Sequence, residues 1–172
     1  MGFDMLLDGC SFLNYHGSNL TVRDEALEKG LFNLVKYLVI KALSNNFTAI
    51  NAILDYIVKN ESPSTIAYKY GISKHQVRGY VQRILDKVDD SYIASKILTI
   101  LYPQIKNIKS PISLTSRGNY CGLCNTWVVR HSVEEHIRRK HKDLVNLYTV
   151  KLINVLKSVK SERHHGLYAY TS

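Results

Sequence analysis

Apolar residues recur at helical spacing over most of the chain, and this pattern is the first indication of the fold. From Thr21 onward the apolar positions lie three or four residues apart, beginning with Leu27, Leu31 and Leu34. This spacing places the apolar side chains on one face of a helix. Similar apolar stripes follow at residues 50–57, 66–84, 92–100 and 137–159. The pattern predicts a mainly α-helical protein.

Interruptions of the pattern predict how the chain is divided. We expect a helical domain at residues 1–102, with Pro103 ending its last helix. Residues 103–119 are rich in proline, serine and glycine, and are typical of a linker. A second module is expected at residues 120–163, followed by a polar tail at residues 164–172.

Signals for two consecutive short helices are concentrated in residues 62–85. Ser62 can cap a first helix, and Gly71 suits its end because a left-handed backbone favours glycine. Ser73 then opens a second helix, and Gln76 completes a Ser-x-x-Gln capping box. The inward-facing positions are apolar, namely Ile66, Ala67, Ile72, Val77 and Tyr80.

This segment resembles the helix-turn-helix family of bacterial, archaeal and viral DNA-binding proteins. The resemblance implies that residues 63–88 bind double-stranded DNA and that the second helix enters the major groove. Arginine and lysine can donate to guanine or to phosphates, and glutamine can pair with adenine. The side chains expected to contact DNA are Ser73, Lys74, His75, Arg78, Gln82 and Arg83. A plain αα-hairpin within a helical bundle is the alternative interpretation.

The net charge of +9 is distributed unevenly along the chain. Residues 102–172 hold 12 Lys and Arg against 4 Asp and Glu, a net charge of +8, whereas residues 1–101 hold 11 against 10. Within the first part, residues 63–88 carry five basic residues against one acidic residue. Basic patches of this kind favour a polyanionic partner, although a solvated basic surface is the simpler alternative.

Two cysteines and two histidines have the spacing of a zinc site. Cys121 and Cys124 form a C-x-x-C pair, and His136 and His141 follow within twenty residues. Thiolates and imidazoles are the ligands that Zn²⁺ prefers, so the spacing predicts one structural zinc ion. The stretch resembles the two-cysteine, two-histidine zinc finger, which implies a β-hairpin packed on a helix. We expect the helix that carries both histidines to continue to about residue 160.

The predicted finger is a poor candidate for reading base pairs. In fingers that read DNA, three helix positions reach the bases, and here they fall on or near Val129, Ser132 and Glu135. Three basic residues lie further along the helix and suit phosphate contacts, namely Arg138, Arg139 and Lys142. A finger that serves only as a scaffold, or that docks a protein, remains an open alternative.

Several function classes are disfavoured by missing signals. The first residues lack the basic start of a signal peptide, and no apolar run is long enough for a membrane span. No P-loop, dinucleotide-binding turn or nucleophile elbow is present. We therefore expect an intracellular protein that is not an enzyme and takes no small-molecule substrate. Residues 1–20 look like a loose arm, and Cys10 has no assigned role.

The combined hypothesis is a sequence-specific DNA-binding protein, specifically a transcription regulator. A helix-turn-helix with one appended finger resembles regulators encoded by viruses and plasmids of thermophilic archaea, which would place the protein in the host cytoplasm. An adaptor protein and an RNA-binding protein are the alternatives. Homodimerisation through residues 22–43 or through the last helix also remains open.

Overall fold

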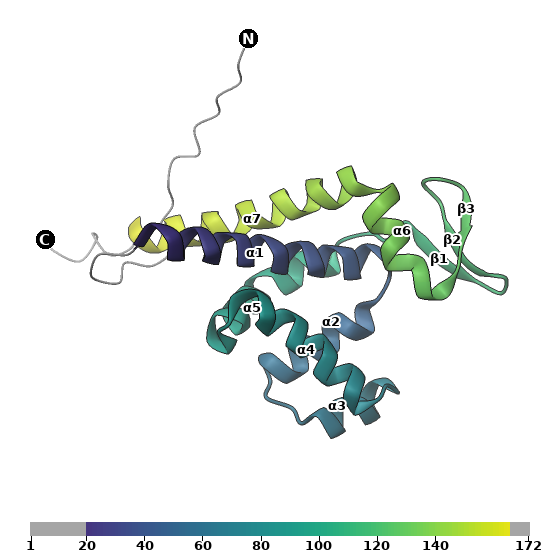
Figure 1. Cartoon of the computed structure of the whole chain (residues 1–172), viewed down its shortest axis with the longest axis horizontal. Helices are drawn as coiled ribbons and strands as arrows, with labels where there is room; N and C mark the ends of the chain where they lie inside the picture. Colours follow the sequence, from purple (N-terminus) through teal and green to yellow (C-terminus); the bar gives the residue numbers. More distant parts are fainter. Residues whose placement is uncertain (1–19, 166–172) are drawn as a thin grey trace, which may run out of the picture.

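The protein is mainly helical and carries a small three-stranded antiparallel sheet (Figure 1). The computed structural model describes residues 20–165, so the expectations for the arm, for Cys10 and for residues 166–172 fall outside it. The helices are α1 (Leu20–Leu43), α2 (Phe47–Ile57), α3 (Pro63–Tyr70), α4 (Lys74–Val88), α5 (Ser91–Lys106), α6 (Val133–Lys140) and α7 (Lys142–His165). The strands are β1 (Ile112–Thr115), β2 (Gly118–Cys121) and β3 (Thr126–Val128), and a short 3₁₀ turn, η1 (Arg130–Ser132), precedes α6.

Helix α1 is the centre of the molecule. Both of its apolar rows are buried, with Leu34 and Leu38 on one and Val35 and Val39 on the other. Such a wide apolar surface needs partners on several sides. Accordingly α1 packs against α2, α4, α5 and α6, and α7 lies along its length (Figure 1).

Both ends of α3 and the start of α4 follow the predicted capping residues. Ser62 accepts a hydrogen bond from the Thr65 amide, and Gly71 ends α3 with a left-handed backbone at φ 63°. At the start of α4, Ser73 and Gln76 form the expected capping box, because each side chain bonds the backbone amide of the other residue. A separate small cluster of buried side chains holds the two helices against α2, namely Ala52, Ile66, Ala67 and Val77.

Helix α5 continues through Pro103, so the prediction that Pro103 ends the helix was wrong. Proline lacks the amide that would bond the carbonyl one turn earlier, yet its ring lies on the exposed side of the helix. Leu101 and Ile105 on the opposite side are fully buried, and their packing holds the last turn in place. Residues 103–119, expected as a linker, thus contain the end of α5, strand β1 and the start of β2.

The histidine-bearing helix does not run straight on, contrary to the sequence expectation. His136 lies within α6, but His141 has a non-helical backbone (φ −121°, ψ 38°) that separates α6 from α7. The physical reason is the spacing. Five residues at 3.6 per turn would point the two side chains about 140° apart on an unbroken helix. The break turns His141 back toward His136, and their ring centroids lie 5.1 Å apart.

One continuous hydrophobic core connects the helices to the sheet. Residues of the sheet and of α6 belong to the same buried cluster as the core of α1, among them Cys121, Val128, Val133 and Ile137. Val128 of β3 and Val133 of α6 supply buried apolar side chains near the cysteines. The sheet therefore rests on the helical bundle at one end of the molecule (Figure 1).

Candidate functional site

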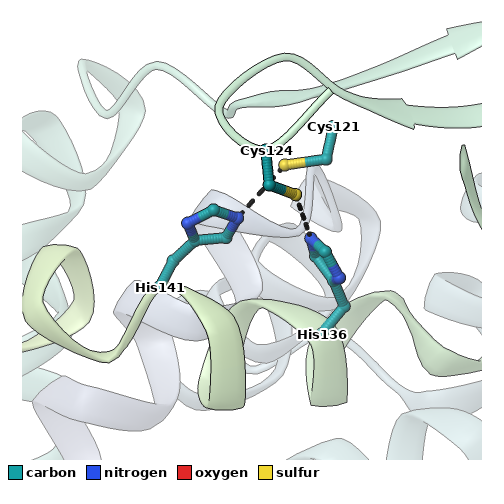
Figure 2. Close-up of side chains that lie close together, drawn as sticks. All are labelled: Cys121, Cys124, His136 and His141. Atoms are coloured by element: carbon teal, nitrogen blue, oxygen red, sulfur yellow. Dashed lines mark hydrogen bonds between the residues drawn. The ribbon is translucent and has the colours of Figure 1, made fainter. Parts of the chain in front are cut away.

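The four predicted metal ligands come together between the sheet and α6. Cys121 is the last residue of β2, and Cys124 lies in the turn before β3. His136 projects from α6, and His141 is its C-cap. One ligand atom from each residue lies within 4.8 Å of all the others, and Figure 2 shows the four side chains pointing toward one another. This group could hold one metal ion.

The distances between these atoms suit a tetrahedral site. Cys121 Sγ lies 3.2 Å from His141 Nε2, and Cys124 Sγ lies 3.4 Å from His136 Nε2. With metal bonds of about 2.3 Å to sulfur and about 2.0 Å to nitrogen, tetrahedral geometry separates S and N by about 3.5 Å. The donor set and its spacing therefore fit a metal ion bound by two thiolates and two imidazoles.

The surroundings favour the protonation states that bind metal. The Thr126 hydroxyl lies 3.1 Å from Cys124 Sγ, and this contact lowers the pKa of the Cys124 thiol. Burial lowers the pKa of His141, which favours the neutral imidazole. Metals bind the thiolate and the neutral ring, so both shifts act in the direction of metal binding.

Two of the three positions expected to read bases, Ser132 and Glu135, have side chains that form contacts within the chain, whereas the Val129 side chain is exposed. Glu135 forms ion pairs with both Arg138 and Arg139, and these pairs lower the pKa of its carboxyl group. The Ser132 hydroxyl donates a hydrogen bond to the Val129 carbonyl at 2.9 Å. The Glu135 carboxylate is thus paired with two arginines of its own helix.

The three basic residues predicted to contact phosphates are exposed. Arg138 and Arg139 share Glu135 as a partner, and the side chain of Lys142 projects from the start of α7. An exposed ion pair contributes little to stability, so either arginine can exchange its carboxylate partner for a phosphate at low cost.

All six residues of the helix expected to contact DNA are exposed, namely Ser73, Lys74, His75, Arg78, Gln82 and Arg83. Arg78 and Arg83 are five residues apart, which puts them about 140° apart around α4. They therefore border the surface that carries His75 and Gln82. Gln82 donates a hydrogen bond to Asp86 at 2.6 Å. Arg83 lies toward α1, where its positive charge partly offsets the burial that raises the pKa of Tyr37 to about 12.

Gly79 lies on this same side of α4 and has no internal packing role. A Cβ atom built on Gly79 would meet no atom within 4 Å. Gly30 of α1 differs, because its Cβ would lie 2.0 Å from the Lys87 carbonyl oxygen. Glycine inside a helix costs roughly 1 kcal/mol relative to alanine. The fold accounts for Gly30, whereas nothing in the described part of the chain requires glycine at position 79.

A buried carboxylate fixes α3 against α2. Asp55 accepts hydrogen bonds from Lys69 at 2.7 Å and from the Tyr70 hydroxyl at 2.6 Å, and Lys59 forms an ion pair with it. Burial alone would raise the pKa of Asp55, but the hydrogen bonds from Lys59, Lys69 and Tyr70 outweigh it and hold the pKa at about 2. The position of α3 on α2 thus depends on the charged Asp55 carboxylate, and the position of α4 follows from that of α3.

Two features were missed in the sequence. One is Lys41, which is buried within α1 and bonded to Glu134 of α6. The other is the aromatic pair of Tyr120 and Trp127 on the sheet, whose ring centroids lie 5.2 Å apart. The alternation of side chains along short strands could have indicated the pair, but no local pattern indicates that Lys41 is buried.

Comparison with protein-family models, with curated proteins and with solved structures found no match for this chain. Among residues 20–165, no helix combines the length and the apolar character needed to cross a membrane. The functional interpretation therefore depends on the residues and their geometry.

Proposed function

We propose that the protein binds double-stranded DNA in a sequence-specific manner and acts as a transcription regulator. In this proposal α3, the Gly71 turn and α4 form a helix-turn-helix, and α4 enters the major groove. The observation that carries the proposal is the exposed surface of α4. It is bordered by Arg78 and Arg83, and it includes a glycine that no internal contact explains.

The charge and the anchoring of this surface support the proposal. The segment from residue 63 to residue 88 has a net charge of +4, from five basic residues and one acidic residue. Hydrogen bonds from Lys69 and Tyr70 to Asp55 tie α3 to α2, and this anchor would present α4 in a fixed orientation. A fixed helix loses less conformational entropy when it binds than a mobile one does.

The metal in this proposal is one structural zinc ion, held by Cys121, Cys124, His136 and His141. Two thiolates with two imidazoles are a usual closed zinc site, and all four positions are filled by protein ligands. The ion would fix the sheet to α6 and thereby orient the basic end of that helix. Arg138, Arg139 and Lys142 would then add phosphate contacts without selecting a sequence.

Selection of bound sequences from a random duplex pool tests the proposal. We expect a defined motif for the zinc-loaded protein, and loss of the motif in Arg78→Ala. In contrast, Arg139→Ala should weaken binding to all duplexes alike and reduce the salt dependence of the affinity. Equal binding of random and selected duplexes by the wild-type protein would refute the proposal.

A further inference from the structure

The outer surface of the three-stranded sheet carries an exposed tryptophan that the proposed function does not use. Ile112, Cys121 and Val128 share the inner side of the sheet and are buried. Side chains alternate along a strand, so Ser113, Tyr120 and Trp127 share the other side. We define these last three residues as the outer sheet surface. The side chain of Trp127 is 54% exposed.

Tyr120 holds the tryptophan in place. The two residues are directly opposite on β2 and β3, and their rings meet edge to face with an interplanar angle of 62°. The Tyr120 hydroxyl donates a hydrogen bond to Asn125 at 3.2 Å, which fixes the tyrosine ring from its far end. One side of the Trp127 indole is therefore supported while the remainder stays available to a ligand.

Two arginines flank this surface. Arg117 and Arg130 are the only Lys, Arg, Asp or Glu residues in segment 110–133, which forms the sheet. Arg117 lies in the turn between β1 and β2, and Arg130 follows β3. Because Val128 pairs with Asn119, both arginines lie at the same end of the sheet. Both are exposed, and neither forms an ion pair within residues 25–159.

An exposed aromatic ring is suited to an unpaired nucleotide strand when the arginines beside it have no ion-pair partner, as is the case here among the described residues. Bases stack on exposed aromatic rings, and arginines neutralise the adjoining phosphates. In a duplex the bases are already stacked inside the helix, so intact double-stranded DNA cannot use the indole in this way. The outer sheet surface is also small, and it includes the polar Ser113 with Thr115 beside it, unlike the broad apolar core of a protein interface.

We propose that the outer sheet surface binds single-stranded DNA, with one base stacked on Trp127 and with Arg117 and Arg130 on its phosphates. The choice of DNA over RNA rests on the proposed function: if α4 binds double-stranded DNA, then DNA is already bound to the same protein. Tyr120 is a positioning residue in this site. The sheet lies beside α6 and away from α3, so the two binding surfaces are separate (Figure 1).

The chain contains a built-in probe, because Trp127 is its only tryptophan. Titration of the full, zinc-loaded protein with a short oligothymidylate should quench the tryptophan fluorescence to saturation. A blunt-ended duplex of two fully complementary strands should leave it unchanged. No quenching by the oligonucleotide, or equal quenching by the duplex, would overturn the proposal.

Variants then locate the site by anisotropy of a labelled oligothymidylate. Trp127→Ala should weaken binding by roughly 10-fold or more, since it removes the ring on which the base stacks. Leu114→Ala is the matched control, because Leu114 is an exposed apolar residue on the opposite side of the sheet. If Trp127→Ala fails to fold, a double variant with both Arg117→Ala and Arg130→Ala replaces it. This double variant should weaken binding and reduce its salt dependence. Equal effects of Trp127→Ala and Leu114→Ala, or no effect of the arginine pair, would overturn the proposal.

Two further measurements distinguish binding of single-stranded DNA from the proposed duplex binding and from binding of RNA. Arg78→Ala should lose duplex selectivity while the oligothymidylate still quenches, so failure of the duplex proposal and failure of the single-strand proposal are distinguishable. An oligouridylate should bind no more tightly than the oligothymidylate. Clearly tighter binding of the oligouridylate would overturn the assignment to DNA.

Discussion

Lys41 Nζ donates a hydrogen bond to Glu134 Oε1 at 2.6 Å, although the two residues are 93 positions apart in the chain. The Lys41 side chain is only 2% exposed, and its charge lies 5.2 Å from the ring centroids of both Tyr37 and Tyr80. Tyr80 belongs to α4, and Glu134 is two residues before His136. One buried ammonium group on α1 therefore contacts both the helix proposed to bind DNA and the helix that carries His136 of the candidate metal site.

Loss of the Glu134 carboxylate should destabilise the protein. Glu134→Ala leaves the Lys41 charge buried without its partner, and breaking a buried pair is strongly unfavourable. Because Glu134 itself is partly exposed, we expect the free energy of unfolding to fall by roughly 2 kcal/mol, below the usual range for fully buried pairs. Urea unfolding of the zinc-loaded protein measures the change.

Glu135→Ala is the matched control for this prediction. It removes the neighbouring carboxylate, whose partners Arg138 and Arg139 are exposed, so it should cost less than about 1 kcal/mol. Adding Lys41→Met to Glu134→Ala should restore much of the lost stability, because no unpaired charge is then buried. Equal costs for the two single variants would contradict this account of Lys41.

Local chemistry explains which parts of the fold were predictable from sequence. Helix caps depend on residues within one turn, so Ser62 and Gly71 marked the two ends of α3 correctly, and the pair Ser73 and Gln76 marked the start of α4. The spacing also identified the four residues that could hold a metal ion, because a C-x-x-C turn and two nearby histidines leave few other arrangements. The DNA contacts assigned to α4 stay a prediction.

The errors arose where tertiary packing overrides local preference. Pro103 normally stops a helix, but burial of Leu101 and Ile105 carries α5 past it. Strand β1 has only four residues, too few for the alternation of side chains to stand out from a loop. Burial of Lys41 follows from a partner 93 residues away, which no window along the chain can reveal.

Metal binding should depend on Cys121 and be independent of Cys10. We expect one zinc ion per chain in metal analysis of the wild-type protein, and little or none in Cys121→Ser. With Co²⁺ in place of zinc, the two thiolates should give an intense charge-transfer absorption that Cys121→Ser weakens. Full metal content and an unchanged Co²⁺ spectrum in Cys121→Ser would refute the site, and the Cys10→Ser control should match the wild type.

Removal of the metal should also lower the stability of the helices. Cys121, Val128 and Ile137 belong to the same core as α1, so loosening the sheet exposes the bundle as well. A chelator should therefore lower the melting temperature recorded by the helical circular dichroism signal, and zinc should restore it. An unchanged helical transition would show that the sheet and α6 contribute nothing to the bundle.

Acid should weaken the anchor between α2 and α3. The pKa of Asp55 is about 2 in the folded protein, against an ordinary value of 3.8. Because the folded value is the lower one, the stabilisation of about 2 kcal/mol is present above about pH 4 and is lost as the pH falls toward 2. Asp55→Asn should remove it at neutral pH and flatten this part of the pH profile.

Urea unfolding at several pH values compares Asp55→Asn with the wild type, and the difference between them cancels the contribution of the metal. Asp86→Asn serves as the control, because Asp86 is exposed and bonds only to Gln82 among the described residues. Its profile should follow that of the wild type. If Asp55→Asn were as stable as the wild type at pH 7, the carboxylate would not be an anchor.

Alanine at position 79 should separate stability from DNA binding. Gly79→Ala adds a methyl group into open space on a helix, so the free energy of unfolding should rise by roughly 0.5–1 kcal/mol. The same methyl group should weaken binding to the selected duplex, because the glycine is proposed to let α4 approach the groove closely. Gly30→Ala is the opposite case, since its methyl group would collide with the Lys87 carbonyl and destabilise the fold. Unfolding curves and duplex titrations of both variants measure the two effects. Full duplex affinity in Gly79→Ala would show that the side of α4 that carries Gly79 does not face DNA.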